Sequence, residues 1–310
     1  MKDRSINPPF AFPQQRVYPS GYQWKWLAGT ARAGAAASRA PRLTFWHLVP
    51  VDSDESPRRY DPFTENALFR TFAAIPPERE AIAEFARKYG LLGVAAPDIK
   101  GEDRFAESLM VWDREISAMW KCVSLWEPIA GRQIDRLREI VQCRWEGERM
   151  ICEINLPDQI GSESLRVGRT QGWIRADSPY FADLLDSVRH GDIMKLARFT
   201  LAHKISMRLR EYKTLPLLME DPVFRLVMQP ESLIAALWLQ FANAVASHHT
   251  LRTCIRCGKW FRVGVGGDHR ADAQYCSNAC RQQKYLERRQ KTEIERKRKK
   301  ERRKRTSTQK

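Results

Sequence analysis

The sequence of 310 residues contains no long apolar run. No stretch approaches the roughly 18 apolar residues that a membrane-spanning helix requires. The N-terminus, MKDRSINPPFAFPQQ, lacks the apolar segment of a signal peptide. We therefore expect a cytoplasmic protein that does not insert into a membrane. Thiols stay reduced in the cytoplasm, so paired cysteines there indicate metal ligands before they indicate disulfides.

Sequence motifs of the common enzyme classes are also missing. The chain has no GxSxG, no HExxH and no dinucleotide-binding fingerprint. The glycines at 264–267 lack the Lys-Ser/Thr of a phosphate-binding loop. Cys122, Cys143 and Cys152 stand among apolar residues, so we interpret them as core residues rather than nucleophiles. No catalytic residue is predicted, and an enzyme with an unrecognised site in the body of the chain remains an alternative.

Positive charge is abundant, and it is unevenly distributed. The chain has 53 Lys+Arg and 37 Asp+Glu, a net charge of +16. Residues 251–310 hold 20 Lys+Arg and 6 Asp+Glu, a net charge of +14, which leaves 33 against 31, or +2, for residues 1–250. This asymmetry indicates an anionic partner for the C-terminal part, with nucleic acid first and an acidic membrane second.

The chain changes character along its length. Residues 1–62 hold eight of the 17 prolines and the run GTARAGAAASRAPR, so we expect a Pro/Ala-rich, partly disordered extension. Residues 63–250 are expected to form a helical body domain. Apolar periodicity, caps and turn residues predict helices over 78–89, 104–130, 132–142, 177–212 and 231–247, and hairpins over 143–156 and 214–230. The predicted fold class is mainly α with small β elements (α+β).

Two pairs of cysteines stand close together near the C-terminus. Cys254 and Cys257 form a CxxC pair, and after eighteen intervening residues Cys276 and Cys280 form a CxxxC pair. Zinc prefers four thiolates in a tetrahedron. Gly258 favours a tight turn at the first pair, and Ser277-Asn278 offers helix-capping groups at the second. Residues 251–285 are therefore predicted to hold one structural Zn²⁺ in a module of knuckle, hairpin and helix start, the arrangement of a zinc ribbon or treble clef.

Other uses of the four thiols stay open at this point. They could form a small core of reduced cysteines, a redox disulfide switch or an iron–sulfur cluster. His269 lies in the loop between the two pairs and could replace one of the ligands. Four cysteines already complete a tetrahedral shell, which favours the zinc interpretation.

The two cysteine pairs also carry a family resemblance. The strings CIRCGKWF and YCSNACRQQKYLERR resemble the C-terminal zinc-ribbon-like finger of bacterial proteins of the CGNR type, closely over about residues 251–290. EFARKYGLLG (84–93) and ESLIAALWLQFANAVA (231–246) are similar to segments of bacterial proteins that carry such a finger. The resemblance implies a bacterial DNA-binding transcriptional regulator with zinc on these four cysteines. Arg281-Gln282-Gln283 follows the last cysteine here, where the family name denotes Gly-Asn-Arg.

A basic tail, residues 286–310, completes the chain. Residues 281–310 contain 15 Lys+Arg, four Glu, and neither Gly nor Pro. Each Glu has a basic residue four positions later, which supports a helix that projects from the zinc module. Only Tyr285, Leu286 and Ile294 are large and apolar, too few for a membrane-binding face. The candidate phosphate contacts are Arg281, Lys284, Arg288, Arg289, Lys291, Arg296, Lys297, Arg298, Lys299, Lys300, Arg302, Arg303, Lys304 and Arg305.

These features together predict a zinc-containing nucleic-acid-binding protein, with DNA favoured over RNA as the partner. A role in transcription regulation follows from the family resemblance. The alternatives are a protein–protein interaction module with a structural zinc and a solubilising tail, or an enzyme of unrecognised type. The sequence gives no indication of oligomeric state.

Overall fold

The chain forms two compact units, Met1–Ala246 and Ser247–Lys310, which are described separately. The computed structural model describes residues 15–28, 44–52, 56, 58–94, 106–146, 149–154, 170–175, 182–220, 224–247, 250–264 and 267–307. Helices predominate in these residues and all sheets are small and antiparallel, which confirms the mainly α fold class with small β elements. No helix among the described residues combines the length and the apolarity needed to cross a membrane.

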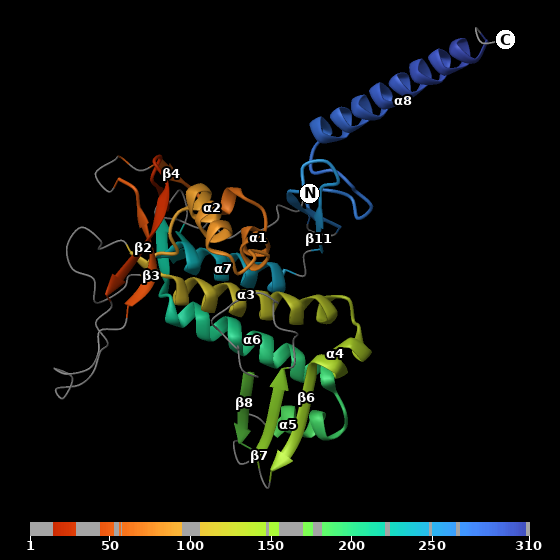
Figure 1. Ribbon diagram of the computed structural model, residues 1–310. Coiled ribbons are helices and arrows are strands. Elements are labelled where there is room, and N and C mark those ends of the chain that lie inside the picture. The colour runs from red at the N-terminus through yellow and green to blue at the C-terminus, as the bar shows by residue number, and fades with distance from the viewer. Residues whose placement is uncertain are drawn as a thin grey trace. The chain divides into compact units, whose positions relative to one another are not determined.

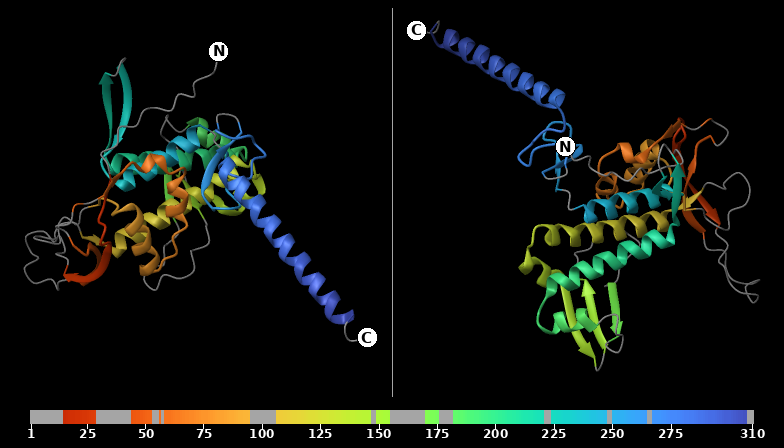
Figure 2. Two further views of the ribbon diagram at one scale, coloured as in Figure 1. Left: turned by 90° about the horizontal axis from the view of Figure 1, so that it is seen from above. Right: turned by 180° about the vertical axis from the view of Figure 1, so that it is seen from behind.

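The first unit is built around three long helices that lie side by side (Figures 1 and 2). These are α3 (Leu109–Ala130), α6 (Ile193–Glu211) and α7 (Leu233–Ala246). Shorter helices pack around them: η2 (Pro62–Thr64), α1 (Leu68–Ala73), α2 (Arg79–Tyr89), α4 (Ile134–Ile140) and α5 (Ala182–Arg189). The helices predicted over 78–89, 132–142 and 231–247 are thus confirmed, to within a few residues at each end.

The core of this unit is aromatic. Phe69 of α1 lies against Phe241 of α7, with ring centroids 5.1 Å apart, and both rings contact Trp126 of α3. Trp112 of α3 is fully buried beside Phe85 of α2. Helix α7 is buried over nearly its whole surface, because its sequence LIAALWLQFANAVA is apolar on almost every side. Trp112 and Trp126 of α3 therefore act as packing residues.

Small sheets surround the helices of the first unit. Two of these sheets have two strands: β1 (Gln15–Val17) pairs with β4 (Arg58–Tyr60), and β9 (Thr214–Glu220) pairs with β10 (Phe224–Pro230). The other two have three strands each. One consists of β2 (Tyr22–Ala28), β3 (Thr44–Pro50) and β5 (Glu107–Ser108), and the other of β6 (Val141–Glu146), β7 (Arg149–Ile154) and β8 (Thr170–Arg175). The hairpin predicted over 214–230 is present as β9 and β10 (Figure 2). The hairpin predicted over 143–156 is β6 and β7, to which β8 adds a third strand.

Part of the N-terminal extension is structured. Strands β1 to β4 all lie within residues 1–62. Val17 and Tyr22 are buried, and Trp24 Nε1 donates a hydrogen bond of 2.9 Å to the carbonyl of Arg79 in α2. The alternating aromatic residues of β2 pair in register with the apolar strand β3, which explains why this proline-rich region contains strands. The low-complexity run at 29–42 lies outside the described residues.

Two predicted helices have different limits in the structure. The stretch predicted over 177–212 forms α5 and α6 in its described part, residues 182–212, and the two helices are separated at Gly191, which has a φ of +82°. Residues 177–181 lie outside the described residues. The carboxylate of Asp192 then caps α6 by accepting from Lys195 N at 2.9 Å. The stretch predicted from 104 begins only at Leu109, because Glu107 and Ser108 pair with β3. Residues 101–105 lie outside the described residues.

A buried carboxyl group joins β5 to the loop that follows α2. Glu107 is 2% exposed, and its two carboxyl oxygens accept hydrogen bonds from the backbone N–H groups of Leu92, Gly93 and Val94 at 2.5–2.9 Å. Burial raises the pKa of this carboxyl to about 7, although the three N–H donors act in the opposite direction. The group is therefore neutral in mildly acidic solution and becomes charged near neutral pH.

This raised pKa predicts a pH-dependent stability. A folded-state pKa above the ordinary 4.5 means that the contribution of Glu107 is complete below about pH 4.5 and is lost as the pH rises through about 7. In Glu107→Gln the group no longer titrates. The difference in unfolding free energy between wild type and E107Q should therefore change by on the order of 3 kcal/mol between pH 4.5 and 8, to the disadvantage of wild type. Urea unfolding followed by tryptophan fluorescence measures it, and a difference independent of pH would contradict the assignment.

Candidate metal centre

The second unit begins with a hairpin that presents the first cysteine pair. Strand β11 (Thr250–Thr253) pairs with β12 (Trp260–Val263), with Thr253 opposite Trp260. Between the strands the chain makes a tight turn, in which Gly258 N donates to Cys254 O and Cys254 N donates to the carbonyl of Lys259, both at 2.9 Å. Gly258 has a φ of +70°, which other residues rarely adopt. This turn places the side chains of Cys254 and Cys257 on one side of the hairpin.

The second pair stands at the start of helix α8 (Asn278–Ser307). The preceding segment lies next to the turn of the first pair, because Ile255 N donates to the carbonyl of Gln274 at 3.1 Å. Ser277 caps the helix by accepting from Cys280 N at 3.2 Å. Cys280 thus lies in the first turn of the helix, whereas Cys276 precedes it. The boundary expected at residue 285 between zinc module and basic tail falls inside this continuous helix.

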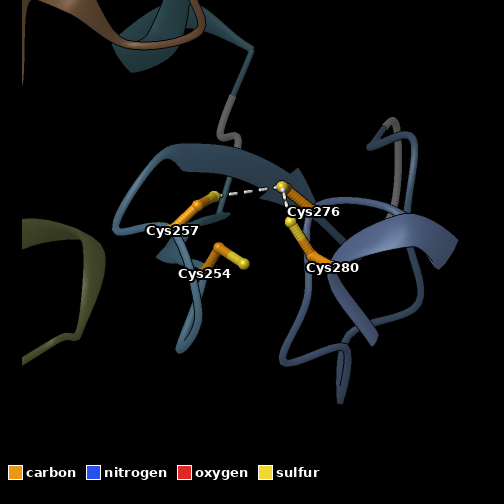
Figure 3. A group of neighbouring side chains, drawn as sticks. All are labelled: Cys254, Cys257, Cys276 and Cys280. Atoms are coloured by element: carbon orange, nitrogen blue, oxygen red, sulfur yellow. Dashed lines mark hydrogen bonds between the residues drawn. The ribbon is translucent and has the colours of Figure 1, made fainter. Parts of the chain in front are cut away.

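The four thiols converge on one point (Figure 3). All four Sγ atoms lie within 4.8 Å of one another, and Cys276 Sγ lies 3.5 Å from Cys257 Sγ and 3.6 Å from Cys280 Sγ. A tetrahedron with metal–sulfur bonds of about 2.3 Å has edges of about 3.8 Å, whereas a disulfide requires about 2.05 Å. The thiols are free, and their separations fit a four-coordinate metal ion.

The surroundings of the sulfur cluster differ from one ligand to the next. Cys254 and Cys280 are 2% and 8% exposed and pack with Phe261 and Val263 of β12, whereas Cys257 is exposed. Burial raises the pKa of the Cys254 thiol, but N–H groups of Cys257, Cys276 and Arg256 that donate to its sulfur outweigh burial and bring the pKa to about 6. The pKa of the Cys276 thiol is shifted in the opposite direction, because burial and hydrogen bonds to the neighbouring sulfurs raise it. A metal ion would bind all four groups as thiolates.

His269, the alternative ligand, does not belong to the metal-binding group found among the described residues. Its ring lies edge-on to Phe261 at 5.1 Å, and its carbonyl accepts from Gly264 N at 2.9 Å. The loop is tight here, because a Cβ on Gly267 would lie 2.8 Å from the carbonyl carbon of Val263. His269 therefore packs on the hairpin while four cysteines form the candidate site.

Helix α8 carries all the predicted phosphate contacts in one continuous element. The side chains of Arg281, Arg288, Arg289, Lys291 and Arg296 are exposed, and Lys284 is partly exposed. The remaining predicted contacts lie in the helix, although their side chains are outside the described residues: Lys297, Arg298, Lys299, Lys300, Arg302, Arg303, Lys304 and Arg305.

Three ion pairs in this unit were not anticipated from the sequence. Arg256, in the turn of the first cysteine pair, contacts Glu287 of α8 with a separation of 3.4 Å, and Lys284 contacts the same carboxylate at 3.3 Å. Arg262 pairs with Asp268 at 3.0 Å across the loop. The Arg256–Glu287 pair spans 31 positions and joins the turn to the helix, so only the folded structure brings its members together.

The remaining cysteines of the chain belong to the first unit. Cys122 is buried in α3, and burial raises the pKa of its thiol to about 12, which makes it a poor nucleophile. Cys143 and Cys152 are register partners on β6 and β7, although their side chains lie outside the described residues.

Comparison with known proteins gives no relative from which a function could be transferred. No family model matches the chain, and no curated protein or solved structure shows a significant match to it. The features of the chain that bear on its function are therefore the thiol cluster and the basic helix that starts from it.

Proposed function

We propose that this protein is a zinc-containing nucleic-acid-binding protein, in which a four-cysteine module of zinc-ribbon or treble-clef type orients a basic helix toward the phosphate backbone. The observation that carries the proposal is that Cys280, a candidate zinc ligand, lies in the first turn of the polycationic helix α8. Metal binding and anion binding thus share one structural element. The CGNR resemblance adds the proposal that the partner is DNA and the role transcriptional regulation.

Zinc is the metal that suits the four thiols best. Tetrahedral sites of four cysteine thiolates are typical of structural zinc. The module is too small to form much of a core, and its described hydrophobic cluster consists of Cys254, Phe261, Val263 and Cys280 with three partly buried neighbours. A bound metal would therefore supply much of its folding free energy. Four protein ligands leave no open coordination position for a substrate or a water molecule, which gives the zinc a structural role.

The charge of α8 supports a nucleic-acid partner. Residues 281–310 carry 15 Lys+Arg against four Glu, a net charge of +11. At about 1.5 Å per residue, the 30-residue helix is about 45 Å long, which exceeds the roughly 34 Å of one turn of duplex DNA. Its basic side chains could therefore reach many phosphates, and such contacts give affinity with little sequence preference.

The binding test is a salt series with the zinc-loaded full chain. Fluorescence anisotropy would compare a labelled DNA duplex, a DNA single strand and an RNA single strand between 50 and 300 mM NaCl. Each phosphate contact contributes about −0.9 to the slope of log affinity against log salt on duplex DNA, so six or more contacts give a slope of about −5 or steeper. Addition of a zinc chelator should weaken binding, because the orientation of α8 depends on the metal.

The same experiment separates the proposal from its alternatives. Absence of binding to all three nucleic acids at 50 mM salt would reject it. Salt-insensitive capture of a protein partner would then favour the interaction module. An enzyme would instead require a polar pocket in the first unit that binds a small molecule.

A further inference from the structure

A surface hollow of about 460 Å³ lies beside the first turns of α8. It is lined by Arg281, Gln282, Tyr285 and Leu286. These positions are i, i+1, i+4 and i+5 of one helix, so their side chains share one face. The hollow therefore starts immediately after Cys280 and lies between the sulfur cluster and the rest of the basic helix.

The apolar residues of this hollow are unusually exposed for their type. Tyr285 is 64% exposed and Leu286 is 52% exposed. They stand within a helix in which nearly every other long side chain is charged or amidic, so a fold-stabilising role does not account for them. An exposed aromatic ring flanked by cations is the arrangement on which the bases of single-stranded nucleic acids stack.

The surface of the hollow is almost wholly apolar. The polar groups of two residues that line it, Arg281 and Gln282, complement the phosphate and the base edge of a nucleotide. The guanidinium of Arg281 is held at the helix start by a hydrogen bond of 3.0 Å to Asn278 Oδ1, which leaves further N–H groups for a phosphate. The amide of Gln282 can both donate to and accept from a base edge. Arg288 and Arg289 follow Tyr285 by three and four positions, so they extend the same face by one turn.

The one acidic residue in this part of α8 lies on another side of the helix. Glu287 is the only acidic residue between Asn278 and Thr292. Its carboxylate pairs with Arg256 and Lys284, and it lies two positions after Tyr285, which places it on a different side of the helix. The face that contains Tyr285 therefore presents cations, an amide and an aromatic ring to an anionic partner.

We propose that this hollow binds an unpaired base, stacked on Tyr285, while Arg281, Arg288 and Arg289 contact the neighbouring phosphates. This inference rests on the proposed nucleic-acid function and specifies its substrate class as single-stranded or locally unpaired nucleic acid. A base inside a continuous duplex is stacked on both faces and cannot reach the ring without being extruded. Phosphate contacts alone would not distinguish the two forms.

The test compares Tyr285→Ala and Tyr285→Phe with wild type in the full zinc-loaded chain. The probes are a 20-nucleotide oligo(dT) strand and a blunt DNA duplex of the same length, at one salt concentration. Y285A should weaken single-strand binding about 10-fold, as expected for removal of a stacking aromatic ring, and change duplex binding less than about twofold. Y285F should bind like wild type, because it keeps the ring. An oligo(dT) with 5-iodouracil should photocrosslink to Tyr285, as read by mass spectrometry.

Each contrary outcome has a separate meaning. Duplex binding by wild type, with no selective loss of single-strand affinity in Y285A, overturns the base-binding inference alone. Failure of wild type to bind either probe overturns the proposed function as well. A change of oligomeric state in Y285A, with unchanged single-strand affinity, would identify the hollow as a protein-docking surface and overturn the inference.

Discussion

Replacement of Cys254 by serine should abolish metal binding by this protein. Cys254 is the most buried of the four candidate ligands, and three backbone N–H groups donate to its sulfur. Serine offers a poor ligand in its place, and structural zinc sites of this kind contribute about 10–16 kcal/mol of binding free energy. Freshly purified wild type should contain about one equivalent of zinc, and C254S should contain less than about 0.1 equivalent by elemental analysis, since only one full site is expected.

The matched control is Cys122→Ser. Cys122 is a buried, free cysteine in α3 of the first unit, and it lies outside the sulfur cluster. C122S should therefore keep the full zinc content. C254S should also lose nucleic-acid affinity, because α8 starts from the cluster, and helical circular dichroism should fall without collapse of the first unit. Wild-type protein with less than about half an equivalent of zinc, or equal zinc in C254S, would refute the site.

Deletion of residues 288–310 should remove most of the nucleic-acid affinity. The deletion takes away 13 of the 15 Lys+Arg in residues 281–310. If six or more of these contact phosphates, affinity for duplex DNA at 50 mM salt should fall by at least about 100-fold. The slope of log affinity against log salt should fall to about half its wild-type value or less, which anisotropy titrations would measure. Zinc content should not change, because all four cysteines precede the deletion.

A second variant separates charge from length. Substitution of the basic residues within 288–310 by glutamine preserves the chain length while it removes the charge. It should reproduce the effect of the deletion if phosphate contacts dominate. If nucleic-acid affinity and its salt slope were unchanged in both variants, residues 288–310 would not contact phosphates. The role proposed for the tail would then be wrong, and solubility would be the remaining explanation of its charge.

The sulfur cluster was predictable from the sequence because its information is local. The CxxC and CxxxC spacings, a glycine after the first pair and a capping serine in the second each specify a short piece of geometry, and the structure brings all four thiols together. The continuous helix α8 was predictable for the same reason, since residues 268–310 contain neither Gly nor Pro to interrupt it. Cys276 itself precedes the helix that holds Cys280, because Ser277 caps α8 between them.

Long-range partners were not predictable, because a single sequence carries no signal for them. Strand β8 joins the predicted hairpin across an intervening stretch of the chain, and β2 pairs with β3 over the low-complexity run. Nothing in the sequence around Glu107 indicates that this carboxyl is buried. The fold places three backbone N–H groups within hydrogen-bonding distance of it. The Arg256–Glu287 ion pair likewise joins residues that are far apart in the sequence. In each case tertiary packing, rather than local periodicity, decides the environment of the side chain.

Cys280 lies in the first turn of α8, so the sulfur cluster and the helix share a backbone segment. A helix turns by about 100° per residue, so a ligand at its start fixes the angular position of every later side chain relative to the metal. Tyr285 is then set at a defined rotation from the sulfur cluster, and the Arg256–Glu287 contact holds that rotation from the side of the hairpin. A metal bound to the four cysteines would therefore set the rotation of α8 about its own axis. Insertion of a single residue after Cys280 would keep the composition and charge of the tail yet turn its whole surface by more than a quarter of a circle.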